Sequence, residues 1–341
     1  MTTHRMQNWA VNKDHVHQDL LKGVSFEPVF IMGLHRSGTT FLYNLLAQTR
    51  QFNVVTAYHV IRYGEILDNH VCGRTAAAKE ELAEEFRRRG ITTRLFDQVS
   101  VSPDSLEEYG FIIDSRARGM LTPQTFPKFN ELCAKIQLTG DPRKPLLLKN
   151  PWDVTRFLYV RQCFPKGRFI FLHRHPMSVL HSQVQAIRSI RDRDNPYLAL
   201  LTKSYGLMLE RPWRRALANL LLSERWHAPR HIAAFRTARG ISYLLKNLSQ
   251  IPESQAVTIR YEDLCADPDK ILQQIIDFLG IAYQVSGFRS LVQERASDPA
   301  SEARRAYGRL RSRVAPYLAL CSYGSEPRVS PTSVPADPPR T

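Results

Sequence analysis

The sequence predicts an α/β protein, a three-layer sandwich in which helices flank both faces of a central parallel sheet. Short, nearly continuous apolar runs alternate with segments of helical periodicity along most of the 341-residue chain. Strands that are buried on both faces have this composition, and the intervening helices cover the sheet. Several runs lead into Gly, Arg, Lys or Pro, and ligands of such sheets bind at the carboxyl ends of the strands.

The predicted elements follow one another in a regular order. The first strand is predicted over residues 28–32, before Gly33, and residues 37–48 carry apolar side chains at helical spacing. This succession predicts strand, glycine loop and helix. Further apolar runs predict strands at 145–149, 168–172 and 257–260. Segments of helical pattern follow them at 154–163, 177–190 and 269–279.

One domain is expected over residues 1–324. Residues 191–240 are aromatic and basic without strand signals, and we interpret them as a helical insertion that covers a substrate. Residues 325–341 contain five prolines and almost no apolar bulk, which predicts a disordered tail.

Composition excludes several classes of protein. The chain is 43% apolar, 10% aromatic and 23% charged, the balance of a folded soluble protein. Its apolar runs are far shorter than the roughly 20 residues of a membrane helix, and residues 1–22 lack the apolar core of a signal peptide. The five cysteines are far apart with no Cys-x-x-Cys pair, so reduced thiols and a cytoplasmic location are expected.

The charge balance predicts an anionic partner. Forty-seven Lys and Arg against 32 Asp and Glu leave a net charge of +15. Nucleic acid, a membrane surface and a phosphorylated small molecule all fit this charge.

Residues 33–40 read Gly-Leu-His-Arg-Ser-Gly-Thr-Thr, with the G-x-x-x-x-G spacing of a phosphate-binding loop. The backbone N–H groups of such a loop and of the helix that follows face an anion. A Walker loop has Lys after its second Gly, but Thr39 and Thr40 follow Gly38 here and the cation is Arg36. The predicted fold is therefore P-loop-like. Its phosphate-binding loop lacks the lysine that characterises nucleoside-triphosphate sites. The alternative interpretation of residues 33–40 is a plain glycine turn before a helix. The combination of Gly, Arg, Ser and Thr in this segment makes that alternative less favoured.

The loop resembles the 5′-phosphosulfate loop of sulfotransferases that use 3′-phosphoadenosine-5′-phosphosulfate (PAPS), where Lys or Arg precedes Ser-Gly-Thr-Thr. The resemblance implies that the loop amides and both threonines hold the 5′-phosphate. It also implies that Arg36 neutralises the bridging oxygen as the sulfuryl group leaves. The donor-binding residues implied in this loop are His35, Arg36, Ser37, Gly38, Thr39 and Thr40.

Three further segments resemble the same family in the expected order. Arg174 at a strand end, with Ser182 eight residues on, resembles the 3′-phosphate site, where a guanidinium fork suits a phosphate. An isolated Arg before a helix more often forms a surface ion pair. The presence of the phosphate-binding loop at residues 33–40 makes phosphate binding the favoured interpretation here. Residues 260–264 resemble the Tyr-Glu-Asp segment, which implies Tyr261 near the adenine and structural acids. Lys149 resembles the strand-end lysine of bacterial and tyrosyl-protein sulfotransferases, which implies a contact with the sulfonate.

The general base is the weakest part of the pattern. The cytosolic small-molecule branch has His where Pro151 stands here, and the other branch has an acid just after the loop helix. His59 lies close to that acid's position, and an imidazole with an ordinary pKa near neutrality suits a general base. Glu65, Asp153 and His70 are further candidates. The acidic residues 102–108 resemble a segment of the same branch, which we interpret as architectural.

The sequence therefore predicts a PAPS-dependent sulfotransferase with PAPS as co-substrate. No metal is expected, because the histidines form no helical His-x-x-x-His pair with an acid, and Arg36 and Lys149 stand in place of Mg²⁺. The expected acceptor is a hydroxyl or amine of a small molecule, glycan, lipid or peptide, with peripheral membrane contact possible and nucleic acid not expected as a partner. The alternative is a non-catalytic nucleotide- or nucleic-acid-binding protein that uses the basic residues 304–313.

Overall fold

The computed structural model describes residues 12–94, 100–113, 119–192, 195–202, 228–292, 308, 312 and 314–323. A five-stranded sheet has the order β2-β3-β1-β4-β5, and every pairing in it is parallel. The strands are β1 (Pro28–Met32), β2 (Asn53–Val54), β3 (Leu146–Lys149), β4 (Arg168–His173) and β5 (Ala256–Arg260). The predicted α/β class and central parallel sheet are confirmed. Four of these strands coincide with the predicted apolar runs.

The strands are apolar on both sides because each face of the sheet has its own core. Phe30, Phe169 and Phe171 belong to one core, while Ile31 and Ile170 belong to the other. On the second face, α1 (Thr39–Gln48) and α13 (Pro268–Phe278) contribute the covering side chains. The first face is covered by α5 (Phe126–Thr139), α6 (Phe157–Cys163), α7 (Pro176–Asp192) and α11 (Ala228–Asn247). These are the three layers that the alternation of apolar runs and helical segments predicts.

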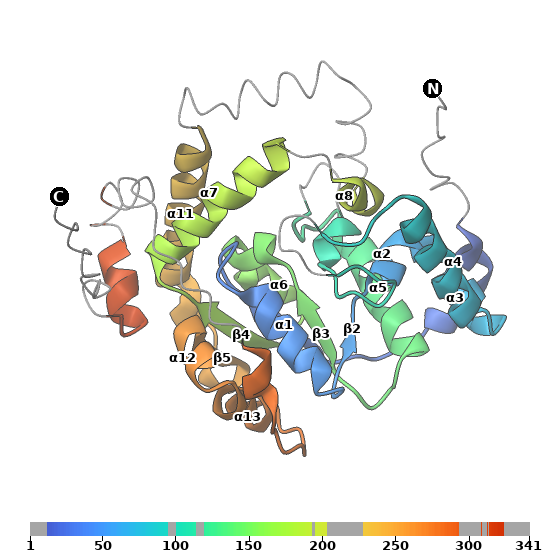
Figure 1. The fold of residues 1–341 in the computed structure, drawn as a ribbon. Coiled ribbons are helices and arrows are strands. Elements are labelled where there is room, and N and C mark those ends of the chain that lie inside the picture. Colours follow the sequence, from blue (N-terminus) through green and yellow to red (C-terminus); the bar gives the residue numbers. More distant parts are fainter. Residues whose placement is uncertain are drawn as a thin grey trace, which may run out of the picture.

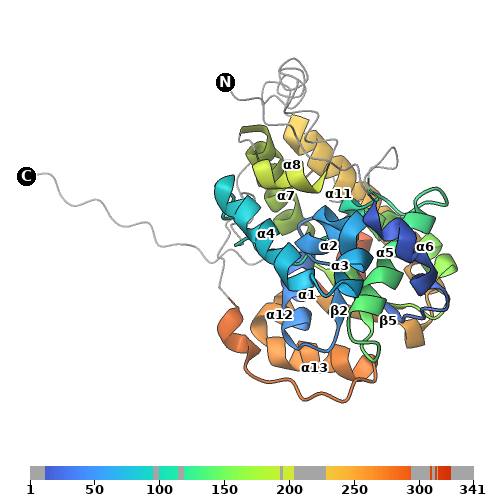
Figure 2. The same ribbon diagram turned by 90° about the vertical axis from the view of Figure 1, so that its right-hand side faces the viewer.

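Further described helices lie beyond the β2 edge or at one end of the molecule: α2 (Ala57–Ile61), α3 (Ile66–Val71), α4 (Thr75–Arg88) and α8 (Pro196–Leu201). The helix α12 (Tyr261–Ala266) directly follows β5, at the opposite edge of the sheet. Figures 1 and 2 show α7, α8 and α11 gathered at one end of the molecule, with α13 at the opposite end. None of the described helices combines the length and apolar composition needed to cross a bilayer.

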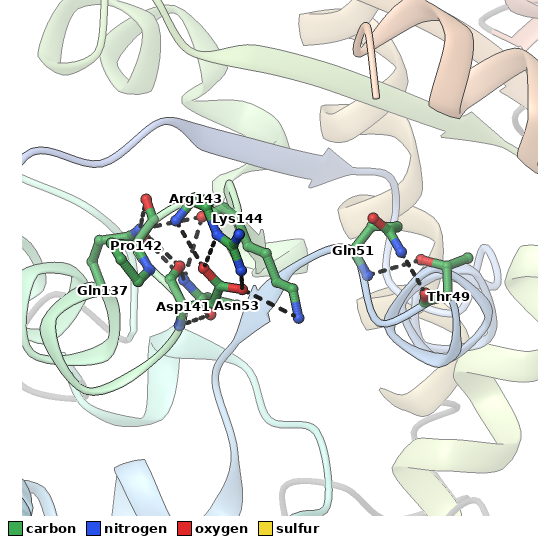
Figure 3. Close-up of polar contacts among 8 residues, drawn as sticks. All are labelled: Thr49, Gln51, Asn53, Gln137, Asp141, Pro142, Arg143 and Lys144. Carbon is green, nitrogen blue, oxygen red and sulfur yellow. Dashed lines mark hydrogen bonds and ion pairs between the residues drawn. The ribbon is translucent and has the colours of Figure 1, made fainter. Parts of the chain in front are cut away.

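The edge strand β2 was not predicted, because two residues carry no periodicity. Its position is fixed by the Asn53 amide, which bonds to the segment before β3 (Figure 3). Its Nδ2 donates to the Asp141 carbonyl at 2.8 Å and to Gln137 Oε1 at 3.2 Å, and its Oδ1 accepts from the Asp141 N–H at 3.1 Å. The Asn53 side chain thus adds hydrogen bonds that hold this short strand, where a longer strand would be held by more backbone hydrogen bonds.

Several predicted boundaries shift for local reasons. The helix expected over 37–48 begins at Thr39, because Gly38 has a left-handed backbone with φ of 98°. The helix expected over 154–163 begins at Phe157, after a 3₁₀ segment (Pro151–Thr155). Most of the described residues of the expected insertion 191–240 are helical, and residues 193–194 and 203–227 lie outside the described residues. The expected tail, 325–341, lies outside them as well.

Candidate functional site

Four strand ends meet at one edge of the sheet. Ile31 of β1 pairs with Lys149 of β3, and His173 of β4 pairs with Arg260 of β5. The loop 33–38, Lys149, Arg174 and Tyr261 are therefore carried to the same edge by parallel strands. The order also reverses direction at β1, whose neighbours are β3 and β4. Such a switch point is where open α/β sheets bind ligands.

The loop after β1 has the backbone of an anion cradle. Arg36 and Gly38 both have left-handed backbones, with φ of 70° and 98°, and α1 begins at the next residue. The first N–H groups of α1 have no partners within that helix, so they are available to an anion. Thr39 and Thr40 form the first turn of α1. A Cβ at Gly33 would lie 2.8 Å from the Leu172 carbonyl, so glycine lets this loop pack against β4.

Ser37 places a buried hydroxyl inside this loop. Its side chain is buried, and within the described part of the chain its Oγ has no hydrogen-bond partner. A buried hydroxyl without a partner costs about 1–3 kcal/mol. A phosphate oxygen seated in the loop would satisfy this hydroxyl.

The residues predicted to bind the donor's 3′-phosphate lie against this loop. Arg36 Nε donates to Ser182 Oγ at 3.1 Å, and Arg174 Nη1 donates to the Arg36 carbonyl at 3.2 Å. The Arg174 guanidinium lies 4.4 Å from the centre of the Tyr261 ring. A Cβ at Gly38 would come within 2.2 Å of the same ring. Three motifs that are far apart in sequence thus form one cluster.

Glu262 and two tyrosines connect the chain segments behind this cluster. Glu262 accepts from the His175 N–H at 3.2 Å and from the Tyr323 hydroxyl at 2.6 Å. The Tyr317 hydroxyl lies 2.9 Å from His173 Nδ1. The C-terminal residues 314–323 therefore pack against the end of β4 that carries Arg174. The two tyrosines carry no motif, and sequence reasoning missed them.

Lys149 forms an ion pair that sequence reasoning also missed. Its Nζ lies 2.5 Å from Glu108 Oε1, and its side chain is only 3% exposed. Burial opposes ionisation of Glu108, but the Lys149 ammonium offsets it and leaves the pKa of Glu108 below its ordinary value. The sequence predicts an architectural role for residues 102–108. That prediction does not include a contact between Glu108 and the strand-end lysine.

Asp153 holds the Glu108 segment onto β3. Its Oδ2 accepts from the Tyr109 hydroxyl at 2.6 Å and from Asn150 Nδ2 at 2.9 Å, and its Oδ1 accepts from the Leu121 N–H at 2.9 Å. Burial raises the pKa of Asp153, and these hydrogen bonds partly counter the shift. Both oxygens have donors and the side chain is fully buried, which is the environment of an anchoring carboxylate.

His59 caps the helix α2. Its Nδ1 accepts from the Thr56 N–H at 3.1 Å, and the Thr56 hydroxyl faces the His59 N–H in return. The neutral ring in this geometry carries its proton on Nε2. Burial, with a contribution from Lys79, lowers the pKa of His59 to about 4, so the expectation of a value near neutrality is corrected. Its role as base stays a prediction.

The other predicted residues divide between the site and its surroundings. His35 lies in the site, with its ring 4.1 Å from Trp152, and burial lowers its pKa to about 4. The Arg236 guanidinium lies 5.2 Å from the Trp152 ring, so α11 closes this side. Glu65 instead pairs with Lys13 and Arg62, each at 3.8 Å. Among the described residues, no cluster of His, Cys, Asp or Glu has the makings of a metal site, and the expected metal independence stays a prediction.

This chain is similar to known proteins in its sequence and in its fold. Residues 28–285 match the model of a family described as "Sulfotransferase family". A Gallus gallus protein, protein-tyrosine sulfotransferase 2, is 22% identical over 256 residues, which are 75% of this chain and 51% of that protein. This chain thus spans about half the length of that relative.

Two solved structures resemble the fold. Sulfotransferase STF9 from Mycobacterium avium has a TM-score of 0.64 and 17% identity, covering 91% of this chain and 81% of its own. Sulfotransferase STF1 from Mycobacterium tuberculosis H37Rv has a TM-score of 0.51 and 16% identity, covering 88% of this chain and 80% of its own. At these low sequence identities, the similarity to the two structures shows a shared fold only.

Proposed function

Because this chain belongs to the sulfotransferase family, we propose that it transfers a sulfuryl group from PAPS to a hydroxyl or amine of an acceptor. The observation that carries the proposal is the cluster of Arg36, Arg174, Ser182 and Tyr261 around Gly38. It joins a phosphate cradle to a second guanidinium, as a donor with phosphates at both its 5′ and 3′ positions requires.

Each residue then has a defined part in holding the donor. The loop amides, with Ser37, Thr39 and Thr40, bind the 5′-phosphate. Arg174 and Ser182 bind the 3′-phosphate, and His35 lines the loop. Tyr261 lies against the adenine, since its ring already packs over Gly38.

The chemistry is a displacement at sulfur. The acceptor oxygen or nitrogen forms a bond to sulfur while the bond from sulfur to the 5′-phosphate oxygen breaks. Arg36 neutralises the charge that develops on the leaving oxygen, and Lys149 contacts the sulfonate. Positioning and charge neutralisation supply most of the rate in such a transfer. A base must also take the acceptor's proton, and His59 is the candidate from the sequence.

The acceptor belongs to a broad class: a small molecule, glycan, lipid or peptide. The name of the Gallus gallus relative points to tyrosine, so phenols are suitable probes. All five cysteines are free thiols, which supports the proposed cytoplasmic location. The alternative is a non-catalytic nucleic-acid-binding protein that uses the basic residues 304–313. Most of these residues lie outside the part of the chain that the structure describes.

Ligand-induced thermal shifts test the donor assignment. The product 3′,5′-adenosine bisphosphate should raise the melting temperature far more than ATP with Mg²⁺, because the loop lacks the Walker lysine and the 3′-phosphate has its own arginine. Transfer of label from ³⁵S-PAPS to phenol or water should follow. Equal stabilisation by ATP, or bisphosphate binding without any sulfuryl transfer, would favour the non-catalytic alternative.

A further inference from the structure

An acidic side chain shares the end of β3 with the cations of the donor site. Glu108 Oε1 lies 2.5 Å from Lys149 Nζ, and the Glu108 side chain retains 20% exposure, so a bound acceptor can reach it. The charges acting on His35, the residue before Arg36, include those of Glu108, Lys149 and Arg36 itself. Glu108 therefore belongs to the same electrostatic neighbourhood as the two residues assigned to the transferring group.

We propose that Glu108 is the general base, whose carboxylate takes the proton from the acceptor as the acceptor attacks sulfur. This inference rests on the proposed sulfuryl transfer and identifies a catalytic residue for it. The acceptor's O–H or N–H proton moves to Glu108, the new bond to sulfur forms, and the electron pair of the broken sulfur–oxygen bond stays on the bisphosphate beside Arg36. Lys149 keeps its proton throughout and bridges the carboxylate and the sulfonate.

The two neighbours of Glu108 hold it in place. The Glu107 carboxylate is buried and bonded to Arg94 and to the Tyr197 hydroxyl. The Tyr109 hydroxyl donates to Asp153 at 2.6 Å. The Glu107 N–H also donates to the Val55 carbonyl at 2.9 Å. With both adjacent side chains locked, Glu108 is presented to the site from a rigid backbone, as a catalytic group requires.

The charges around Glu108 keep it in the form that a base needs. Burial opposes ionisation of Glu108 and Glu107 acts on it with like charge, but the Lys149 and Arg94 cations favour its carboxylate. Glu108 is therefore ionised at neutral pH and ready to accept a proton. His59 differs, because its Nδ1 lone pair already accepts the Thr56 N–H and its Nε2 carries hydrogen. In this conformation His59 Nδ1 has no free lone pair with which to take the acceptor's proton.

Replacement of Glu108 by Gln tests the proposal, because Gln keeps the size of the side chain and an oxygen for Lys149. With ³⁵S-PAPS as donor and phenol as acceptor probe, Glu108→Gln should lower kcat by roughly 10²- to 10⁴-fold. Affinity for 3′,5′-adenosine bisphosphate, measured by calorimetry, should stay within about twofold of wild type, since that ligand is held by other residues. Glu108→Asp, which keeps a carboxylate, should retain part of the activity.

A second acceptor separates a base from a residue that merely positions Lys149. 4-Nitrophenol is far more acidic than phenol and needs little help to lose its proton. The defect of Glu108→Gln should therefore shrink markedly with 4-nitrophenol. An equal loss with both phenols would overturn the proposal and make Glu108 a positioning residue for Lys149.

Two other variants complete the design. Glu81→Gln removes an exposed carboxylate on α4, a residue with no assigned role, and should leave turnover unchanged. His59→Ala should cost less activity than Glu108→Gln with phenol, and the reverse order would assign the base to His59 and overturn our proposal. If wild-type protein neither binds 3′,5′-adenosine bisphosphate nor transfers label to phenol, 4-nitrophenol or water, the sulfuryl-transfer function itself fails, and the role of Glu108 fails with it.

Discussion

Arg174 combines two tasks at the end of β4. One nitrogen supports the phosphate loop through the Arg36 carbonyl at 3.2 Å, and the guanidinium plane lies 4.4 Å from the centre of the Tyr261 ring. An arginine used in this way is already oriented before a ligand arrives, which lowers the entropy lost on binding.

Replacing Arg174 by Ala should therefore weaken binding of 3′,5′-adenosine bisphosphate at least tenfold. The charge-assisted bond to the 3′-phosphate is worth on the order of 1.5–3 kcal/mol. Adenosine-5′-phosphosulfate lacks that phosphate, so its affinity should change much less. Titration calorimetry measures both, with Arg88→Ala on α4 as a control of equal charge. Equal weakening of the two ligands would mean that Arg174 acts only through the loop.

Asp153 is the residue on which the acidic segment depends. Asp153→Ala leaves the Tyr109 hydroxyl, the Leu121 N–H and the Asn150 amide without their acceptor in a buried place. The free energy of unfolding should fall by about 2–4 kcal/mol, since each unsatisfied group costs about 1–3 kcal/mol and removal of a buried charge returns part of it. Urea denaturation measures the loss, and Glu81→Ala on the exposed face of α4 should be nearly neutral.

Single residues were predictable where a motif fixed them. The phosphate loop was named from its glycine spacing, and Arg174, Ser182 and Tyr261 were named from their resemblance to sulfotransferase motifs. The structure brings all of them together. Glu108 was not assigned, because its partner Lys149 lies 41 positions away and nothing in the local sequence links the two. His59 was named for an imidazole pKa near neutrality, but burial, which only the packed protein reveals, lowers that pKa to about 4.

The loop and α12 form a unit in which Gly38 makes room for the Tyr261 ring. We expect Gly38→Ala to abolish most bisphosphate binding, because the new Cβ would meet the ring at 2.2 Å and φ of 98° disfavours any side chain. Gly73→Ala is a matched control, since Gly73 has φ of 66° and no atom within 4 Å of its missing Cβ. The control should lose only about 1 kcal/mol of stability through backbone strain.

Thermal shift with and without bisphosphate separates these two costs. Gly38→Ala should lose the ligand-induced shift, whereas Gly73→Ala should keep it despite a lower starting temperature. If both variants retain the shift, Tyr261 moves aside freely and does not shape the donor site.

Strands were predictable where they formed a continuous apolar run. The apolar runs identified β1, β3, β4 and β5, because a strand covered on both faces has few polar residues. The edge strand β2 escaped because Asn53 holds it through a side-chain amide. The order β2-β3-β1-β4-β5 was also beyond sequence reasoning, since periodicity does not tell which strands pair.

Burial of neutral histidines makes the whole molecule sensitive to acid. Burial lowers the pKa of His35, His59 and His173 from 6.5 to about 4. The unfolded chain therefore binds protons at higher pH than the folded chain does. Their contribution to stability is complete above pH 6.5 and is lost progressively as the pH falls towards 4.

The free energy of unfolding, measured by urea denaturation, should consequently drop between pH 7.5 and pH 5 by roughly 1–2 kcal/mol per histidine. His173→Gln removes one titrating ring and should make this pH dependence shallower. A stability that does not change over this interval would show that the three rings are protonated equally in both states.

The position of β5 at the edge of the sheet has a consequence for synthesis on the ribosome. β5 pairs only with β4 in the sheet, and it delivers Tyr261 to a loop that begins at Gly33. A nascent chain can form β1, β3 and β4 long before residues 256–261 leave the exit tunnel. Until then the loop lacks its aromatic cover, so we expect a ligand of this loop to stabilise the chain only after β5 has joined the sheet.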